Sequence, residues 1–309
     1  MRQKEVDRGF VRRVLVLLCV LVVTNSLAGQ KNDNSSGDPI DLEGATLIVD
    51  EIPGLIDGDR DYPPGRLLHL AADGSVIFES NMLKMPFDAV RMGDGSYWVS
   101  LIRENALWRI SQASETLAVI PVGGYPCAFE LLPNGNILVA GWDDDVPGFV
   151  KEFNSSGEIV WQLLDLKWPW KAERLANGNT LIADAGTNRI FEVNARREEV
   201  WAIENLGPEE NRLFDGLGPV YVQRIENGNT LVSIRGTNQI VEFDRSGDVV
   251  WEVGDELVQA PYSAVRLKNG NTLIADTGNA RVIEINKDKK IVWRKDGLGY
   301  PAKVYREER

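Results

Sequence analysis

The chain has 309 residues, 43% of them hydrophobic, and a formal net charge of −12 at pH 7. This acidic balance argues against nucleic acids and anionic membrane surfaces as partners, and it is compatible with cations or basic partners. Histidine occurs once and cysteine twice. A catalytic zinc site built on several histidines is therefore not expected.

The N-terminal segment has the pattern of a signal peptide. Arg12 and Arg13 precede the apolar run Val14–Val23, and Ser26–Ala28 forms a small-x-small cleavage site. The length of the run suits a signal-peptide core and is short for a membrane span. We therefore expect residues 1–28 to direct the protein to secretion or to the periplasm. An uncleaved segment that tethers the protein to a membrane is the alternative.

The rest of the chain divides into a spacer and one domain. Residues 29–43 are polar and rich in Ser and Asn, which predicts a disordered spacer, and 44–309 has the length of a single domain. Cleavage would leave Cys127 as the one cysteine, so no disulfide is expected within the mature chain. It would also remove five basic and two acidic residues, which takes the net charge to about −15.

A five-residue phrase recurs along the domain. Asn-Gly-Asn-Thr-Leu stands at Asn177–Leu181, Asn227–Leu231 and Asn269–Leu273, with a near copy at Asn134–Leu138 and a weaker one at Asp94–Trp98. The turn glycines of these phrases are 40, 43, 50 and 42 residues apart. A second phrase with the same period ends in Trp161, Trp201, Trp251 and Trp293. Repeats of this length are typical of solenoids and propellers.

Each repeat predicts four short strands. In residues 262–295, turn residues at Asn269-Gly270, Thr277–Asn279 and Lys287–Lys289 separate runs rich in Val, Ile and Leu. The Asn-Gly pair suits a type I′ hairpin turn, and no segment of the repeat has helical spacing. Four antiparallel strands at this period form one propeller blade.

Five complete blades are expected, at residues 87–121, 126–163, 170–203, 220–253 and 262–295. An N-terminal blade built from Ala45–Glu51, Arg66–Ala71 and Ser75–Glu79 lacks its first strand, and its Phe78 stands where the other blades have Trp. The last segment, Tyr300–Val304, resembles the first strands of the other blades. We therefore predict an all-β, six-bladed β-propeller that the C-terminal strand closes, since closure removes the exposed sheet edge.

The irregular loops of this propeller would all lie on one face. The hairpins between first and second and between third and fourth strands share one face, which we call the hairpin face. The other, the loop face, carries the irregular segments Pro53–Gly65, Gly141–Gly148, Asp165–Trp170 and Ile203–Pro219. Variable loops on a rigid scaffold are where binding residues gather, so we expect any site on the loop face, over the central channel.

These loops are acidic, so we consider whether they bind calcium. Asp57, Asp59 and Asp61 have the alternate spacing of a calcium loop, and Asp143, Asp144 and Asp145 follow in a second loop. Tyr62 and Leu68 stand where an EF-hand needs Gly and Glu, so the segment is not an EF-hand. A weak calcium site and a solvated acidic loop are both open, and no other cofactor is predicted.

Two sets of side chains could contact a ligand. Trp142, Trp168 and Trp170 flank the loop face, where they would stack on a ligand or pack over the channel mouth, whereas the four repeated Trp residues belong between blades. Arg91, Arg174, Arg224 and Arg266 each precede a turn Asn or Asp by three residues. These arginines would form either inter-blade salt bridges, with Asp88, Glu130 and Glu173 nearby, or a site for a small anion.

Two phrases carry a family resemblance. Leu267–Gly278, with a near copy at residues 175–186, and Arg281–Asn286 resemble the NHL-repeat propellers and the bacterial arylsulfotransferase and quinoprotein-like propellers. The arylsulfotransferase resemblance implies sulfuryl transfer by histidines near the channel. This chain has the single histidine His69, on a third strand away from the axis, so none of those catalytic histidines can be carried over.

We therefore expect an exported, monomeric propeller that binds a protein or a small anionic ligand without chemistry of its own. The alternatives are an arylsulfotransferase-like or lyase-like enzyme, in which Arg and Asp or Glu replace histidine, and a purely structural scaffold. A deep polar channel would favour an enzyme or a small ligand. A channel plugged by side chains would favour a protein partner.

Overall fold

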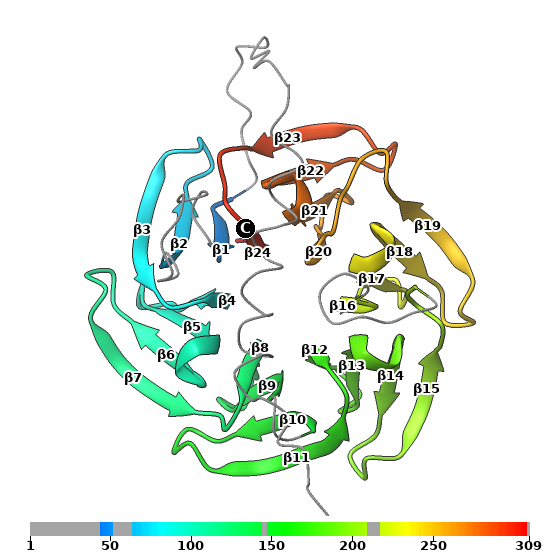
Figure 1. Ribbon diagram of the computed structural model, residues 1–309, viewed down its shortest axis with the longest axis horizontal. Coiled ribbons are helices and arrows are strands. Elements are labelled where there is room, and N and C mark those ends of the chain that lie inside the picture. Colours follow the sequence, from blue (N-terminus) through cyan, green and yellow to red (C-terminus); the bar gives the residue numbers. More distant parts are fainter. Residues whose placement is uncertain (1–43, 52–63, 144–146, 209–216, 308–309) are drawn as a thin grey trace, which may run out of the picture.

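The computed structural model describes residues 44–51, 64–143, 147–208 and 217–307. The predicted signal peptide and spacer, and five of the acidic loop residues, Asp57, Asp59, Asp61, Asp144 and Asp145, lie outside the described residues. The described chain forms six four-stranded antiparallel sheets arranged as blades around a central axis (Figure 1). No helix in the described ranges has the length and hydrophobicity needed to cross a membrane.

The strands are given blade by blade, from the axis outward. Blade 1 is β24 (Pro301–Arg306), β1 (Thr46–Asp50), β2 (Gly65–Leu70) and β3 (Val76–Leu83); blade 2 is β4 (Pro86–Arg91), β5 (Tyr97–Leu101), β6 (Ala106–Ile110) and β7 (Thr116–Pro121); blade 3 is β8 (Tyr125–Leu131), β9 (Ile137–Trp142), β10 (Gly148–Phe153) and β11 (Ile159–Leu166). Blade 4 is β12 (Pro169–Arg174), β13 (Thr180–Asp184), β14 (Arg189–Val193) and β15 (Glu199–Ile203); blade 5 is β16 (Pro219–Arg224), β17 (Thr230–Ile234), β18 (Gln239–Phe243) and β19 (Val249–Val253); blade 6 is β20 (Ser263–Arg266), β21 (Thr272–Asp276), β22 (Arg281–Ile285) and β23 (Ile291–Lys295). The predicted six-bladed architecture is confirmed.

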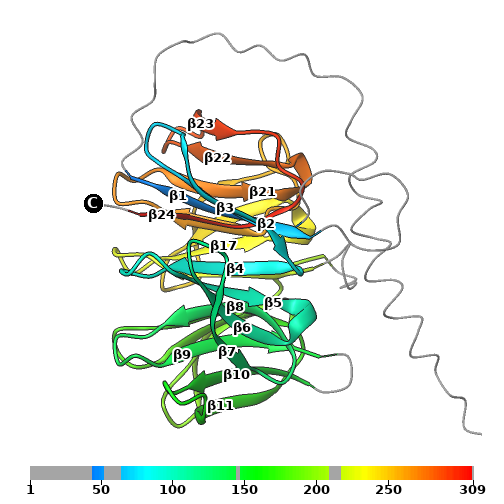
Figure 2. The same cartoon turned by 90° about the vertical axis from the view of Figure 1, so that its left-hand side faces the viewer.

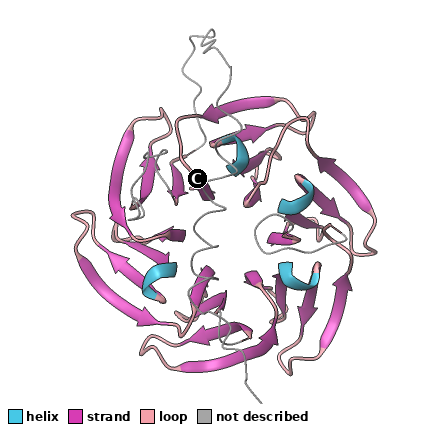
Figure 3. Ribbon diagram, in the orientation of Figure 1, coloured by secondary structure: helices cyan, strands magenta, loops and turns pink. Residues whose placement is uncertain are grey.

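Short 3₁₀ turns link the second and third strands of four blades, where Figure 3 draws them in cyan. They are η1 (Ile102–Glu104), η2 (Ala185–Thr187), η3 (Arg235–Thr237) and η4 (Thr277–Asn279). In η2 the Asp184 carboxylate accepts the Gly186 N–H. These turns lie on the loop face, beside the inner strands that enter the channel from that side.

The C-terminal strand closes the ring, as predicted. β24 pairs with β1 in antiparallel register, with Ile48 opposite Val304. Backbone hydrogen bonds extend this pairing at both ends, from Glu51 N–H to Tyr300 O and from Glu307 N–H to Ala45 O. Figure 2 shows the ring edge-on, with β1 beside β24.

The repeated Asn-Gly turn differs from the type I′ turn that the sequence suggested. Gly270 has a φ of +85°, but Asn269 is not among the residues with positive φ. The Gly270 N–H donates to Leu267 O, and the Leu267 N–H donates to Asn271 O. This pattern is a type I turn followed by a left-handed glycine, which needs positive φ at one position where type I′ needs it at two.

The core of the molecule lies between the blades. The second strands β1, β5, β13, β17 and β21 are buried along their full length, because each packs against blades on both sides. The leucines that end the repeated phrase, Leu181, Leu231 and Leu273, are 0% exposed. The outer strands are the exposed ones, and Val200 and Val249 are more than half exposed. The repeated phrase therefore encodes blade packing.

Candidate functional site

Four aromatic side chains close the channel at the loop face. Phe87, Trp170, Tyr262 and Tyr300 come from the inner ends of four different blades, and none is more than 6% exposed. Their ring centroids lie 5.3 to 5.7 Å apart in tilted and edge-to-face pairs, the arrangement that aromatic quadrupoles favour. We call this cluster the aromatic plug.

The three loop-face tryptophans all pack against this region. Trp142 and Trp170 are each 5% exposed, and Trp168 is half-buried against the same cluster. Tyr125 meets the Trp142 ring edge-on at 5.2 Å. This burial favours packing over the channel mouth, rather than stacking on a ligand, for Trp142 and Trp170.

A small cavity lies beneath the plug. Asp88, Tyr221, Ser263 and Lys303 line it together with plug residues, and its volume is about 20 Å³. A cavity of this size holds roughly one water molecule. This cavity therefore has no room for a drug-sized ligand unless side chains move.

Side chains on the inner strands tie neighbouring blades together around the channel. The inner strand of a blade has one edge without a strand partner, so its N–H groups need other acceptors. The acceptors come from the preceding blade: Asp88 for Phe129 N–H, Glu130 for Arg174 N–H, Glu173 for Arg224 N–H, Gln223 for Arg266 N–H and Ser263 for Val304 N–H. At the junction of blades 1 and 2, Lys303 Nζ lies 3.7 Å from Asp88.

Burial changes the titration of two of these channel groups. Desolvation raises the pKa of Glu173 to about 7, although the Arg224 N–H and nearby Lys171 oppose the shift. Desolvation also raises the pKa of the Tyr221 hydroxyl, which keeps it neutral. The inner channel thus holds polar groups whose hydrogen bonds join the blades.

Each predicted arginine lies between blades, and three of them share one arrangement. The guanidinium pairs with a third-strand glutamate of the preceding blade and covers that blade's Trp ring. The sets are Arg174–Glu152–Trp161, Arg224–Glu192–Trp201 and Arg266–Glu242–Trp251, with N–O distances of 2.8 to 3.2 Å and ring distances of 4.7 to 5.0 Å. We call this set the Arg–Glu–Trp module.

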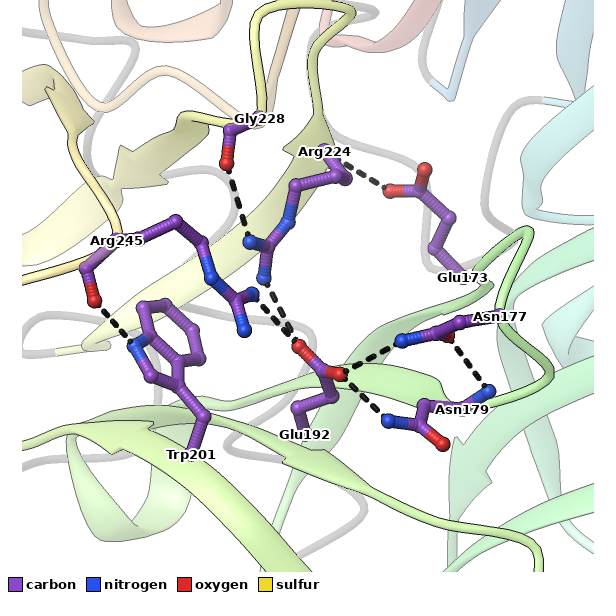
Figure 4. A network of polar contacts seen from close by, with 8 residues as sticks. All are labelled: Glu173, Asn177, Asn179, Glu192, Trp201, Arg224, Gly228 and Arg245. Atoms are coloured by element: carbon purple, nitrogen blue, oxygen red, sulfur yellow. Dashed lines mark hydrogen bonds and ion pairs between the residues drawn. The ribbon is translucent and has the colours of Figure 1, made fainter.

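Figure 4 shows the module between blades 4 and 5. Glu192 is 1% exposed in its side chain and accepts hydrogen bonds from Arg224, Arg245, Asn177 and Asn179. Asn179 is the second Asn of the repeated phrase, and the equivalent Asn229 and Asn271 bind Glu242 and Glu284 in the same way. The phrase therefore also supplies a hydrogen bond to the module.

The carboxylates that the sequence analysis placed near these arginines are not the ion-pair partners of their guanidinium groups. Asp88, Glu130 and Glu173 accept backbone N–H groups, while the actual partners lie on third strands. Those glutamates each precede a repeated Trp by nine residues, a signal that the sequence contains. A fourth module, Arg306–Glu284–Trp293, was missed in the same way. These ion pairs match the salt-bridge interpretation of the arginines more closely than the anion site.

Arg91 lies in a different setting. It bonds Glu307 at 3.4 Å, and the position of the module glutamate is taken by His69, nine residues before Phe78. The His69 Nδ1 lies 2.9 Å from the Tyr97 hydroxyl. The single histidine is therefore held between blades 1 and 2, away from the loop face.

Two buried ionisable residues that the sequence did not single out lie at the channel mouth, on the loop face. Glu51 and Arg235 follow the second strands of blades 1 and 5, and they are 3% and 6% exposed. Arg235 donates to the Tyr300 hydroxyl at 2.7 Å and lies 4.9 Å from the Tyr262 ring centroid. Desolvation raises the pKa of Glu51 to about 8, against the attraction of Arg235. Sequence pattern could not find this pair, because 183 residues lie between its members.

No metal centre is present in the part of the chain that the structure describes, where no three His, Cys, Asp or Glu residues are arranged to hold an ion. Asp143 is described, and its five calcium-candidate companions are not. The calcium hypothesis therefore stays a prediction.

Comparison with known proteins supports the fold. No protein-family model matches the sequence, and no curated protein matches it. A protein of unknown function from Bacteroides caccae is 18% identical with a TM-score of 0.65, over 84% of this chain and 98% of that one. A nidogen/laminin complex contains a chain 13% identical with a TM-score of 0.61, over 84% and 97%.

An enzyme is also among the similar structures. Virginiamycin B lyase from Staphylococcus aureus is 12% identical, with a TM-score of 0.55 over 84% of this chain and 86% of that one. At these identities the likeness shows the fold alone. The chain is a six-bladed β-propeller, and its narrower resemblance to NHL-repeat and arylsulfotransferase propellers stays an expectation.

Proposed function

We propose that this protein is an exported, non-catalytic binding module that engages a protein partner with its loop face, around the channel mouth. One observation carries the proposal: the aromatic plug closes the channel above a cavity with room for one water molecule. A partner would therefore dock on the mouth instead of entering the channel. Export is inferred from the N-terminal sequence pattern.

The rigidity of the ring supports a binding role. Hydrogen bonds between inner strands and the Arg–Glu–Trp modules join neighbouring blades, so the loops stand on a fixed base. Rigid surfaces lose less conformational entropy when they bind. A similar solved structure comes from a nidogen/laminin complex, which is a protein–protein assembly.

A lyase-like enzyme is the second candidate, because Glu51 is a buried acid beside Arg235 at the mouth. A carboxyl group with a pKa of about 8 can act as a general acid near neutral pH. Virginiamycin B lyases are among the similar structures, one of them a catalytically inactive histidine-to-alanine variant. In this chain the only histidine is His69, between blades 1 and 2, so such chemistry would need other groups.

Affinity capture tests the proposal. The mature chain, residues 29–309, would be used as bait, with a double variant Arg103→Glu/Lys167→Glu on the loop face and Lys287→Glu on the hairpin face as the matched control; all three residues are exposed. We expect a captured protein to be lost with the loop-face variant and kept with the control. Equal capture by both variants would contradict the loop-face assignment. Turnover of a streptogramin B or an aryl sulfate by the mature chain would favour the enzyme.

A further inference from the structure

The junction of blades 1 and 2 differs from the four junctions that hold an Arg–Glu–Trp module. In those four, the glutamate is fixed on a third strand and lies 2.8 to 3.2 Å from its arginine. At the junction of blades 1 and 2 the third strand supplies His69, and Arg91 pairs with Glu307, the residue after the last strand β24. The carboxylate at this junction therefore comes from the chain end and not from a blade.

Glu307 satisfies this junction incompletely. One oxygen of its carboxylate lies 3.4 Å from Arg91 and 3.6 Å from His69 Nε2, and both distances exceed those of the modules. The Nε atom of Arg91 and the Nε2 atom of His69 are buried without a hydrogen-bond partner. Buried polar atoms without partners are rare in folded proteins, so each one needs an explanation. The junction offers more N–H donors than Glu307 uses.

The proton position on His69 follows from its two neighbours. Its Nδ1 atom lies 2.9 Å from the hydroxyl of Tyr97, a residue that is 0% exposed. A carboxylate beside Nε2 favours the tautomer with the proton on Nε2, and Nδ1 then accepts the Tyr97 O–H. Burial lowers the pKa of His69, which keeps the ring neutral at neutral pH. His69 therefore presents a neutral N–H donor beside the Arg91 guanidinium.

The junction is open to solvent on the hairpin face. The side chains of Arg91 and Glu307 are each 33% exposed, whereas that of His69 is 1% exposed and lies behind them. Arg91 is the last residue of β4, directly before the first hairpin of blade 2. Because the carboxylate of Glu307 already occupies this place, the junction has room for a carboxylate group without any further cavity.

We infer that Arg91 and His69 form a binding site for a small free carboxylate, and that the Glu307 side chain is its displaceable internal occupant. We call these two residues the junction site. An arginine binds a planar carboxylate through two parallel N–H donors, and the unbonded Nε atom of Arg91 supplies the second of them. Arg91 is the permanent cation paired with Glu307 among the described residues, and a single positive charge matches a monoanion better than a phosphate or sulfate dianion.

This inference goes beyond the proposed function, because the junction site lies on the hairpin face and the proposed partner docks on the loop face. A bound carboxylate takes the place of the Glu307 side chain. Binding is therefore linked to a contact of the residue that directly follows the closing strand β24.

The ring of the only histidine reports on the occupancy of the junction site. Formate is the probe, titrated at constant pH into the ¹⁵N-labelled mature chain, residues 29–309, while NMR follows the imidazole nitrogen signals. Glu307→Ala empties the site, and Glu226→Ala, at an exposed glutamate of a blade 5 hairpin, is the matched control. We expect half-saturation of Glu307→Ala at a formate concentration at least tenfold lower than for wild type or control, since a tethered carboxylate competes at a high effective concentration.

Two further measurements test the donors and the class of ligand. The double variant Glu307→Ala/Arg91→Gln should show no saturable shift with formate. Sodium chloride at equal ionic strength corrects for screening, and sodium phosphate tests a larger oxyanion. No saturable shift in Glu307→Ala, equal half-saturation in Glu307→Ala and wild type, or tighter binding of phosphate than of formate would each overturn the inference.

The wild-type titration remains decisive even if a variant does not fold. Formate competes with Glu307 there, so it should shift the imidazole signal at higher concentration, and a signal that does not move would contradict the junction site. Neither outcome changes the capture experiment on the loop face, so the two proposals fail independently.

Discussion

His69 Nε2 lies 3.6 Å from a Glu307 carboxylate oxygen, at the junction of blades 1 and 2. His69 takes the place that glutamates hold in the Arg–Glu–Trp modules, and Glu307 from the C-terminal segment supplies the carboxylate that bonds Arg91. The junction next to the ring closure therefore depends on a titratable side chain and on the chain end.

Acid should weaken this junction. Burial lowers the pKa of His69, with Arg91 adding to the effect and Glu307 opposing it. A base with a lowered pKa in the folded state favours folding above its unfolded pKa of about 6.5, and this contribution is lost as pH falls. His69→Gln removes the only histidine. The variant should therefore lose less stability than wild type between pH 7.5 and 5.5 in urea unfolding; an unchanged slope would contradict this role.

Removing the Glu192 side chain should lower the free energy of unfolding more than removing most side chains near the surface. Its carboxylate joins Arg224 and Arg245 to two Asn side chains and is almost fully buried. Glu192→Ala leaves two cations without that partner, so we expect a loss of about 3 kcal/mol of unfolding free energy. The exposed Glu226→Ala is the control, with a change within about 0.5 kcal/mol. Similar values for both variants, from denaturant unfolding, would show that the module contributes little.

Closure by β24 should be essential for solubility. Deleting residues 300–309 removes the strand that pairs with β1, which leaves an open sheet edge prone to aggregation. Deleting only residues 308–309 is the control and should leave a soluble protein. Light scattering and thermal unfolding compare the two. A soluble, cooperatively folding product of the longer deletion would be evidence against the closure.

Ionisation of Glu173 should lower the free energy of unfolding at alkaline pH. Its raised pKa of about 7 means that ionisation is less favourable in the folded state than in the unfolded one. Its contribution to stability is full below about pH 4.5 and is lost as pH rises through 7. Glu173→Gln keeps an oxygen for the Arg224 N–H, and we expect it to be about 1–2 kcal/mol more stable than wild type at pH 8 and equal at pH 4.5. Equal stability at both pH values in urea titrations would contradict the shift.

Repeated local sequence motifs predicted the fold, whereas the candidate site is formed by residues that lie far apart in the sequence. The Asn-Gly-Asn-Thr-Leu phrase encodes a turn glycine, an Asn that binds a glutamate and a buried Leu, so its repetition revealed the blades. The tryptophans of this repeat were correctly placed between blades, but their glutamate partners were missed although the spacing of nine residues was visible. The type I′ turn was a wrong inference, because Asn-Gly fits two hairpin geometries. Arg235 of blade 5 acts electrostatically on Glu51 of blade 1 through the ring arrangement, which local sequence does not express.

The pairing of β1 with β24 also sets an order of events during synthesis. The ribosome makes Thr46–Asp50 long before Pro301–Arg306, yet the two strands are neighbours in one sheet. Blade 1 therefore has only three of its four strands while the other five blades are synthesised. The growing chain therefore holds an unpaired strand until residues 301–306 have been made, so any chaperone that binds it earlier contacts an open ring before the propeller closes.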